Sequence, residues 1–332
     1  MKLKIASIAS YLPRNRVSSL TLDNIVKGKE GGIMDATGVR YRHHISDDEC
    51  VSQMGAGALK LALDRAGLQA ADLDLLIFAG ASFDYPVPHN SALIKARLTD
   101  DRVNFDCFDI DSTCLSFLHA LDVTHLYLLS GRYKRVAIVS SEISSLALSP
   151  SDEKVYGLFG DAAVAVIVES TESTGYTPGF VNFKNFPSGV FLTMVPVGGA
   201  VNRGINSPPD DPGYNFKMEG KNLLRLISKH IDGFIADMEE RSGTGINQFD
   251  KIITHQASKV GNEFFNKRFS IPPGKRVDTL EIHGNCISAS IPLGLEKLLN
   301  DGYNTGGKRI LLFGTGAGLT IGSLVLEFDP LN

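Results

Sequence analysis

Three residues of chemically useful type follow expected strand ends in this sequence. Cys114 comes after the apolar run 103–110, His255 ends the run 249–255, and Asn285 stands shortly before a helix expected at 290–302. Ligands of open α/β sheets meet the carboxyl ends of the strands, so these side chains can share one cavity. A thiol, an imidazole and a carboxamide can together activate a sulfur nucleophile or stabilise an oxyanion.

The position of Cys114 favours reactivity. The segment 114–130 reads as a helix that is apolar on nearly every face, with Cys114 as its first residue. A helix N-terminus and a nearby imidazole both favour the thiolate, so we expect the pKa of this thiol to lie below its ordinary value. An inert, buried thiol is the alternative interpretation. Cys107 reads as core, Cys50 as helix packing, and Cys286 as a neighbour of the site that does not react.

Several histidines compete with His255 for the role of base. His119 and His125 share a helix with Cys114, but the first points away from the thiol and the second lies about 16 Å along the axis. His283, two residues before Asn285, is the main rival.

Strands and helices alternate along the whole chain. Continuous apolar runs predict buried strands at 73–80, 103–110, 135–142 and 162–169, with helices at 48–67, 88–98 and 114–130. The second half repeats this plan, with helices at 218–243, 258–269 and 290–302 and strands at 249–255, 308–316 and 319–329. The pattern "RVAIVSSE…FGDAAVAVIVE" returns as "KRILLFGTGAGLTIGSLVLEF", which indicates an internal duplication. We therefore divide the chain into an N-terminal half, 1–172, and a C-terminal half, 173–332, with a long loop at 198–215 near a site mouth.

Composition excludes several classes of protein. The 332 residues carry a net charge of −4, which argues against nucleic-acid binding. No apolar run is long enough for a membrane helix, and the N-terminal "MKLKIASIASYLP" reads as a first strand. The four cysteines lack metal-ligand or disulfide spacing, so we expect no metal site and a cytoplasmic location.

Five ordered motifs resemble β-ketoacyl-acyl-carrier-protein synthase III of the thiolase superfamily. They are "FDIDSTCLSFLHAL", "FGDAAVAVIVE", "THQAS", "HGNCISASIPLGL" and "GTGAGLTIG". The resemblance implies an α/β, thiolase-like duplicated α-β-α-β-α five-layer fold, a homodimer, and acyl carrier protein or acyl-coenzyme A as partners, with no cofactor. It further implies that Cys114 accepts the acyl group, that His255 and Asn285 bind the extender thioester, and that the backbone of Cys114, Gly316 and Ala317 forms the oxyanion hole. The expected reaction is decarboxylative Claisen condensation of the Cys-bound acyl group with a malonyl-type thioester, giving a β-keto thioester.

Departures from the family pattern predict a specialised enzyme of fatty-acid or polyketide-type biosynthesis. Gly32 and Ala36 stand where the family often has a ring that stacks on adenine and a basic side chain, so the handle for coenzyme A is weakened. Leu115 and Ser116 replace smaller residues, and the segment 83–92, which often shapes the acyl pocket across the dimer, also differs. A basic patch near the histidine motif is predicted to receive the acidic carrier protein, and it comprises Lys217, Lys221, Arg225, Lys259, Lys267 and Arg268.

Three other functions stay open at this point. The chain could transfer acyl groups to an alcohol or amine, or condense β-keto thioesters toward a ring. It could also be a catalytically silent partner subunit of a ketosynthase heterodimer, although the complete set of Cys114, His255 and Asn285 argues against silence.

Overall fold

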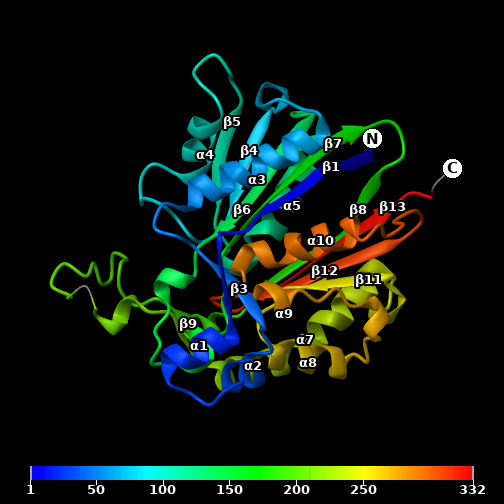
Figure 1. The fold of residues 1–332 in the computed structure, drawn as a ribbon. Coiled ribbons are helices and arrows are strands. Elements are labelled where there is room, and N and C mark those ends of the chain that lie inside the picture. The colour runs from blue at the N-terminus through cyan, green and yellow to red at the C-terminus, as the bar shows by residue number, and fades with distance from the viewer. Residues whose placement is uncertain (1, 209, 331–332) are drawn as a thin grey trace.

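A nine-stranded mixed sheet forms the framework of the computed structural model, which describes residues 2–208 and 210–330 (Figure 1). The strand order is β11-β12-β13-β8-β1-β7-β6-β4-β5. In chain order these strands are β1 (Lys2–Tyr11), β4 (Leu75–Ala79), β5 (Asp106–Ile110), β6 (Arg135–Glu142), β7 (Ala162–Thr171), β8 (Tyr176–Asn185), β11 (Lys251–Thr254), β12 (Arg309–Gly316) and β13 (Thr320–Phe328).

The sheet consists of two copies of one arrangement. In the first, β1, β7 and β6 are antiparallel neighbours and β4 pairs parallel to β6; in the second, β8, β13, β12 and β11 repeat this pattern. The two copies meet through one backbone pair, Leu3 with Tyr176. The predicted duplication is therefore confirmed, and the boundary at 172/173, which lies in the turn between β7 and β8, stays a prediction.

Helices form three layers around the two half-sheets (Figure 1). α3 (Val51–Ala66) and α4 (Asn90–Leu98) pack on the outer face of the first half, and α7 (Gly220–Ser242) and α8 (Lys259–Arg268) on that of the second. α5 (Ser116–Leu129) and α10 (Ser290–Asn300) lie between the halves. The result is the predicted five-layer α-β-α-β-α fold.

Short elements complete the chain. They are β2 (Asn15–Ser18), α1 (Ser19–Val26), α2 (Gly32–Thr37), β3 (Tyr41–His44), α6 (Glu153–Tyr156), β9 (Thr193–Met194), β10 (Lys217–Met218) and α9 (Leu280–His283). None of the helices in the described ranges is both long and apolar enough to cross a membrane.

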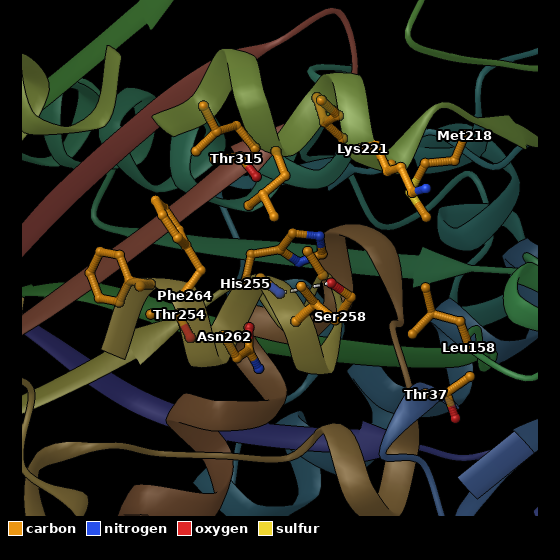
Figure 2. A pocket seen from close by; sticks show the side chains of 18 of the residues that line it. Thr37, Leu158, Met218, Lys221, Thr254, His255, Ser258, Asn262, Phe264 and Thr315 are labelled. Atoms are coloured by element: carbon orange, nitrogen blue, oxygen red, sulfur yellow. Dashed lines mark hydrogen bonds between the residues drawn. The ribbon is translucent and has the colours of Figure 1, made fainter. Parts of the chain in front are cut away.

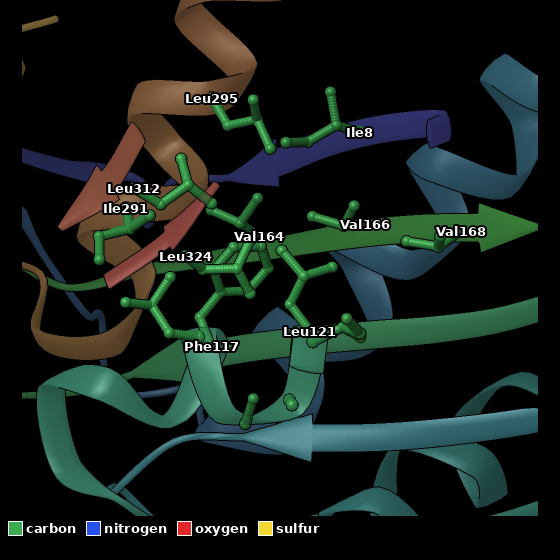
Figure 3. Close-up of a cluster of buried hydrophobic side chains, with 14 of the residues drawn as sticks. Ile8, Phe117, Leu121, Val164, Val166, Val168, Ile291, Leu295, Leu312 and Leu324 are labelled. Atoms are coloured by element: carbon green, nitrogen blue, oxygen red, sulfur yellow. The ribbon is translucent and has the colours of Figure 1, made fainter. Parts of the chain in front are cut away.

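The central core lies between the half-sheets (Figure 3). Phe117 and Leu121 of α5 meet Ile291 and Leu295 of α10, and strands from both halves supply valines and leucines around them. Because both faces of β4 are covered, all five of its residues are buried, which explains its continuous apolar run.

The starts of two helices differ from the sequence prediction for reasons that the structure shows. The helix expected at 48–67 begins at Val51, because the Asp84 carboxylate accepts hydrogen bonds from the backbone N–H groups of Val51 and Ser52. The helix expected at 114–130 begins at Ser116, because residues 113–115 form a 3₁₀ turn with Thr113 at a φ of 51°.

The same turn precedes both central helices. The backbone N–H of Ser112 donates to Ser116 Oγ at 2.9 Å, and that of Cys286 donates to Ser290 Oγ at 3.0 Å. Ile287 repeats the positive φ of Thr113, at 48°. Ser288 thus occupies in the second half the place that Cys114 occupies in the first.

Truncation of the central core should cost stability. Phe117 is 1% exposed, so we expect Phe117→Ala to lower the free energy of unfolding by about 3–5 kcal/mol. Leu20→Ala removes an exposed side chain and serves as the control, with an expected change below about 0.5 kcal/mol. Urea titration followed by circular dichroism measures both, and equal losses would contradict the assignment of the core.

Candidate active site

Cys114, His255 and Asn285 all line one cavity of about 350 Å³, which we call the acyl cavity. Thr315, Gly316 and Ala317, at the turn between β12 and β13, line the same cavity. The three candidate residues thus lie around one cavity, and the catalytic roles assigned to them stay a prediction. His283 and Cys286 do not line this cavity, and neither do Cys50, Cys107, His119 or His125.

Cys114 is half-buried, and its environment disfavours the thiolate. Burial raises the pKa of the Cys114 thiol to about 12, and the charge of Glu142 acts in the same direction. The backbone N–H groups of Ala317 and Cys114 oppose this shift only in part. The expected lowering of the pKa is therefore wrong, because dehydration of the thiolate outweighs the favourable field of the helix N-terminus.

His255 is buried and offers no positive charge to the sulfur. Burial lowers the pKa of its imidazole to about 4, so it is neutral at pH 7. Its backbone N–H donates to Phe313 O at 2.8 Å, which fixes the residue against β12. Its Nδ1 has no hydrogen-bond partner within the described residues. Such an unpaired polar atom beside a cavity is a ready partner for a ligand oxygen or a water.

Gly314 lets the two reactive side chains approach each other. A Cβ at this position would lie 2.8 Å from Leu115 Cδ2 and 2.9 Å from His255 Cβ. Both distances are shorter than van der Waals contact, so any side chain would push the Cys114 turn and His255 apart. Leu115, which the sequence showed to be unusually large, fills the space that this glycine leaves.

A short backbone strap holds Asn285. Its N–H donates to Leu158 O at 2.9 Å, and its C=O accepts from Gly160 N at 3.1 Å. Its side-chain Nδ2 donates to Ala257 O at 3.2 Å, and its Oδ1 accepts from Ile287 N at 2.9 Å. One N–H of the carboxamide is therefore left for the cavity.

Other candidate histidines and cysteines have structural surroundings. His119 packs on the ring of Phe183, and His125 Nε2 lies 3.0 Å from the hydroxyl of Tyr176. Burial lowers the pKa of His283 to about 4, and the backbone carbonyl of this residue accepts from Cys286 Sγ.

A second cavity of about 490 Å³, which we call the access channel, adjoins the acyl cavity, and the two share the lining residues Met218, Leu223, His255, Ala257 and Thr315. Figure 2 shows His255 in the middle of this channel, with Thr37, Leu158 and Lys221 to one side and Thr254 and Phe264 to the other. Its charged lining residues in the described ranges are Asp152, Lys154 and Lys221.

The predicted basic patch is divided by the fold. Lys221 lines the channel, and Lys259 Nζ donates to the backbone carbonyl of Asp35 at 3.3 Å, close to the channel mouth. Arg268 forms an ion pair with Asp232, so its charge is neutralised. The remaining predicted residues are exposed: Lys217, Arg225 and Lys267.

Sequence reasoning missed Glu142 and Ser288. The buried Glu142 carboxyl accepts hydrogen bonds from the backbone N–H groups of Ala81 and Ser82 and from the Ser82 hydroxyl, and it also bonds to Ser288 Oγ. Burial raises its pKa. A signal for Ser288 was present in the sequence. Ser116 and Ser290 are 174 residues apart, and Ser288 follows Cys114 at the same spacing.

The pH dependence of alkylation tests the state of the thiol. Because the pKa of Cys114 is raised to about 12 in the folded chain, its thiolate fraction near neutral pH is smaller than in the unfolded chain. We expect its reaction with iodoacetamide, followed by mass spectrometry of the tryptic peptide, to accelerate about tenfold per pH unit up to about pH 10. The urea-unfolded protein should level off near its ordinary pKa of about 8.5. A plateau of the folded protein below about pH 9 would contradict the assignment.

Comparisons with known proteins agree with this geometry. Residues 108–185 match the family model 3-oxoacyl-[acyl-carrier-protein (ACP)] synthase III, and residues 240–328 match the model of its C-terminal part. Beta-ketoacyl-[acyl-carrier-protein] synthase III of Neisseria meningitidis is 31% identical over 98% of this chain and 99% of its own.

Solved structures share the whole fold. The 3-oxoacyl-[acyl-carrier-protein] synthase III of Aquifex aeolicus superposes with a TM-score of 0.86 at 27% identity, over 98% of this chain and all of its own. The priming β-ketosynthase of the R1128 polyketide pathway superposes with a TM-score of 0.86 at 26% identity, over 99% of this chain and 97% of its own. With its duplicated five-layer fold and its cysteine, histidine and asparagine around one cavity, the chain belongs to the 3-oxoacyl-[acyl-carrier-protein] synthase III family of the thiolase superfamily.

Proposed function

We propose that the protein catalyses decarboxylative Claisen condensation of a Cys114-bound acyl group with a malonyl-type thioester. The observation that carries this proposal is that two cavities meet at His255. Cys114 lines the acyl cavity, and the access channel offers a separate path to the same place. A thiol that holds an acyl group needs an enclosed apolar cavity, and the second substrate needs its own path to that thiol. The family relatives named above support the same reaction class.

Acylation starts from a neutral thiol. The sulfur of Cys114 attacks the carbonyl carbon of an acyl thioester while its proton leaves, so no free thiolate accumulates in the buried site. Negative charge develops on the carbonyl oxygen, which the N–H groups of Cys114 and Ala317 are placed to bind. Such preorganised donors contribute about 3–4 kcal/mol each. The thiol of the carrier or of coenzyme A then leaves with the proton.

Condensation uses His255 and Asn285. The carboxylate of a malonyl-type thioester leaves as carbon dioxide, and its electron pair forms an enolate whose oxygen accepts hydrogen bonds from His255 and the free N–H of Asn285. A neutral imidazole suits this step, because it donates a hydrogen bond without trapping the enolate by full protonation. The enolate carbon attacks the acyl-Cys114 carbonyl, and the Cys114 sulfur leaves and takes up a proton. The scheme uses no cofactor and no metal ion.

The acyl cavity favours a hydrocarbon donor. Most of its other lining residues are apolar, namely Ile143, Ala147, Leu148, Phe159, Met194, Val195, Phe216 and Ile287, beside the small polar residues Ser82, Ser144 and Thr193. A fatty acyl chain buries apolar surface there, whereas a polar acyl group would lose its hydration.

The mouth of the channel favours delivery by a carrier protein in a specialised pathway. Gly32 and Ala36 both lie in α2, Ala36 lines the channel, and neither side chain carries a ring that could stack on adenine. Lys154, Lys221 and Lys259 supply positive charge at the same place. An acidic carrier protein would match this charge, and its pantetheine arm would enter the channel.

A homodimer is the assembly that we propose. The edge strand β5 lacks a second neighbour in the sheet, and the loop before α4 exposes Phe83, Tyr85 and Val87 at 59%, 59% and 83%. Both features suit a contact with a second copy, since exposed strand edges and apolar patches are normally covered.

Separate assays of the two half-reactions test the proposed roles. We expect Cys114→Ala to abolish the acyl adduct seen by mass spectrometry after incubation with acyl thioesters, while Cys107→Ala, the control, retains it. His255→Ala and Asn285→Ala should keep the adduct and lower carbon dioxide release from malonyl thioester about 10²–10³-fold. An adduct without carbon dioxide release would indicate simple acyl transfer, and no adduct in the native protein would indicate a silent subunit.

Charge reversal tests carrier delivery. The double variant Lys154→Glu, Lys221→Glu should raise KM for carrier-bound malonate about tenfold more than KM for malonyl-pantetheine. Lys267→Glu is the control, because Lys267 lies near the C-terminal end of α8 and does not line the channel. An equal rise for both substrates, or an equal effect of Lys267→Glu, would contradict docking at the channel mouth.

A further inference from the structure

The access channel continues past the reaction centre. Its lining residues on α7 lie at positions 220, 221, 223, 224, 227 and 231, which share one helix face. From Lys221 to Ile231 this face extends about 15 Å along the axis. His255 lies between the two ends (Figure 2), so the channel has a mouth side and a far side. We call the far side the far arm; it is lined by Leu224, Ile227, Ile231, Thr254, Phe264, Phe265 and Phe313.

The far arm presents an apolar surface. Its charged neighbours, Asp152, Lys154 and Lys221, all stand on the mouth side, where α2 and α6 pack together. The polar side chains Thr254 and Asn262 are both hydrogen-bonded to the buried Gln256, at 3.2 and 3.0 Å. These bonds hold both side chains to Gln256, and the other side chains that line the far arm are hydrocarbon.

The position of His255 decides which part of a substrate reaches the far arm. A pantetheine arm comes from the mouth side and ends at the thioester carbonyl beside His255. Most side chains of the far arm are hydrocarbon and would leave its amide groups without hydration, so the amide groups stay on the mouth side. The acyl group of the donor is bonded to Cys114 and occupies the acyl cavity. The part of the substrates left for the far arm is therefore a substituent on carbon 2 of the extender, the carbon next to its thioester carbonyl.

We propose that the preferred extender is a 2-alkylmalonyl thioester whose alkyl branch lies in the far arm. This inference rests on the proposed condensation and adds the class of its second substrate. The acyl-Cys114 thioester, the 2-alkylmalonyl thioester carboxylate and one proton give a 2-alkyl-3-keto thioester, carbon dioxide and free Cys114 thiol. The carbon–carbon bond forms at the branched carbon, and the carboxylate and Cys114–acyl bonds break.

The far arm limits the size of the branch. From Leu224 to Ile231 the helix rises about 10 Å, so the arm accepts an unbranched alkyl chain of several carbons. Ile231, Phe265 and Phe313 are 2%, 5% and 4% exposed and close its end. Burial of such a chain removes apolar surface from water, which favours the alkylated over the plain extender.

A competition between two extenders tests this proposal. Protein acylated on Cys114 is given malonyl-pantetheine or 2-butylmalonyl-pantetheine, which share one handle, and carbon dioxide and product mass are measured. We expect the native protein to use the butylated extender with at least the kcat/KM of the plain one. Ile227→Phe, which fills the arm, should lower the ratio of the two kcat/KM values at least tenfold. Ser228→Phe places the same ring on the exposed face of α7 and should leave the ratio unchanged.

A second variant covers the case in which Ile227→Phe fails to fold. Phe264→Leu enlarges the arm and should raise kcat/KM for 2-hexylmalonyl-pantetheine relative to the butylated extender. The proposal is overturned if the native protein turns over malonyl-pantetheine but rejects the butylated form, or if both variants leave the ratios unchanged. If no extender releases carbon dioxide, the proposed condensation itself is contradicted, and the inference that rests on it is contradicted too.

Discussion

The close approach of the Cys114 turn to strand β12 is the constraint on which the rest of the site depends. It brings Leu115 against Gly314 at a distance that no side chain at 314 would permit. This contact fixes the sulfur beside Ala317 and His255, and it fixes α5 in the centre of the molecule. The same packing contacts therefore build the apolar core and shape the acyl cavity.

Tight packing also sets the electrostatics of the site. Burial raises the pKa of Cys114 to about 12 and lowers that of His255 to about 4, so both groups are neutral at physiological pH. A charged thiolate–imidazolium pair would need water or counter-charges, and Glu142 is the charge that lies nearby. The site is suited to reactions in which charge develops on a substrate oxygen and is bound there by N–H groups.

Sequence patterns predicted most elements and brought out the three residues that share the acyl cavity, because both leave local signals. Buried strands appear as apolar runs, and Cys114, His255 and Asn285 follow strand ends within recognisable motifs. The direction of the Cys114 pKa shift was predicted wrongly, because burial depends on segments far away in the chain. The start of α3 depends on Asp84, and the loss of Arg268 from the basic patch depends on Asp232, partners 33 and 36 residues distant. Such pairings arise only from the folded arrangement.

The repeated turn before the two central helices shows that the same backbone conformation can present side chains with different roles. Cys114 and Ser288 stand at the same place in the same kind of 3₁₀ turn, yet Cys114 lines the acyl cavity and Ser288 does not. Ser288 instead donates to the backbone carbonyl of Ala79 and bonds to Glu142. The turn alone does not make a nucleophile. The role of each side chain depends on the groups that it faces across the interface between the two halves. The turn of the second half thus ties the C-terminal half to β4 and β6 of the first half, through Ala79 and Glu142.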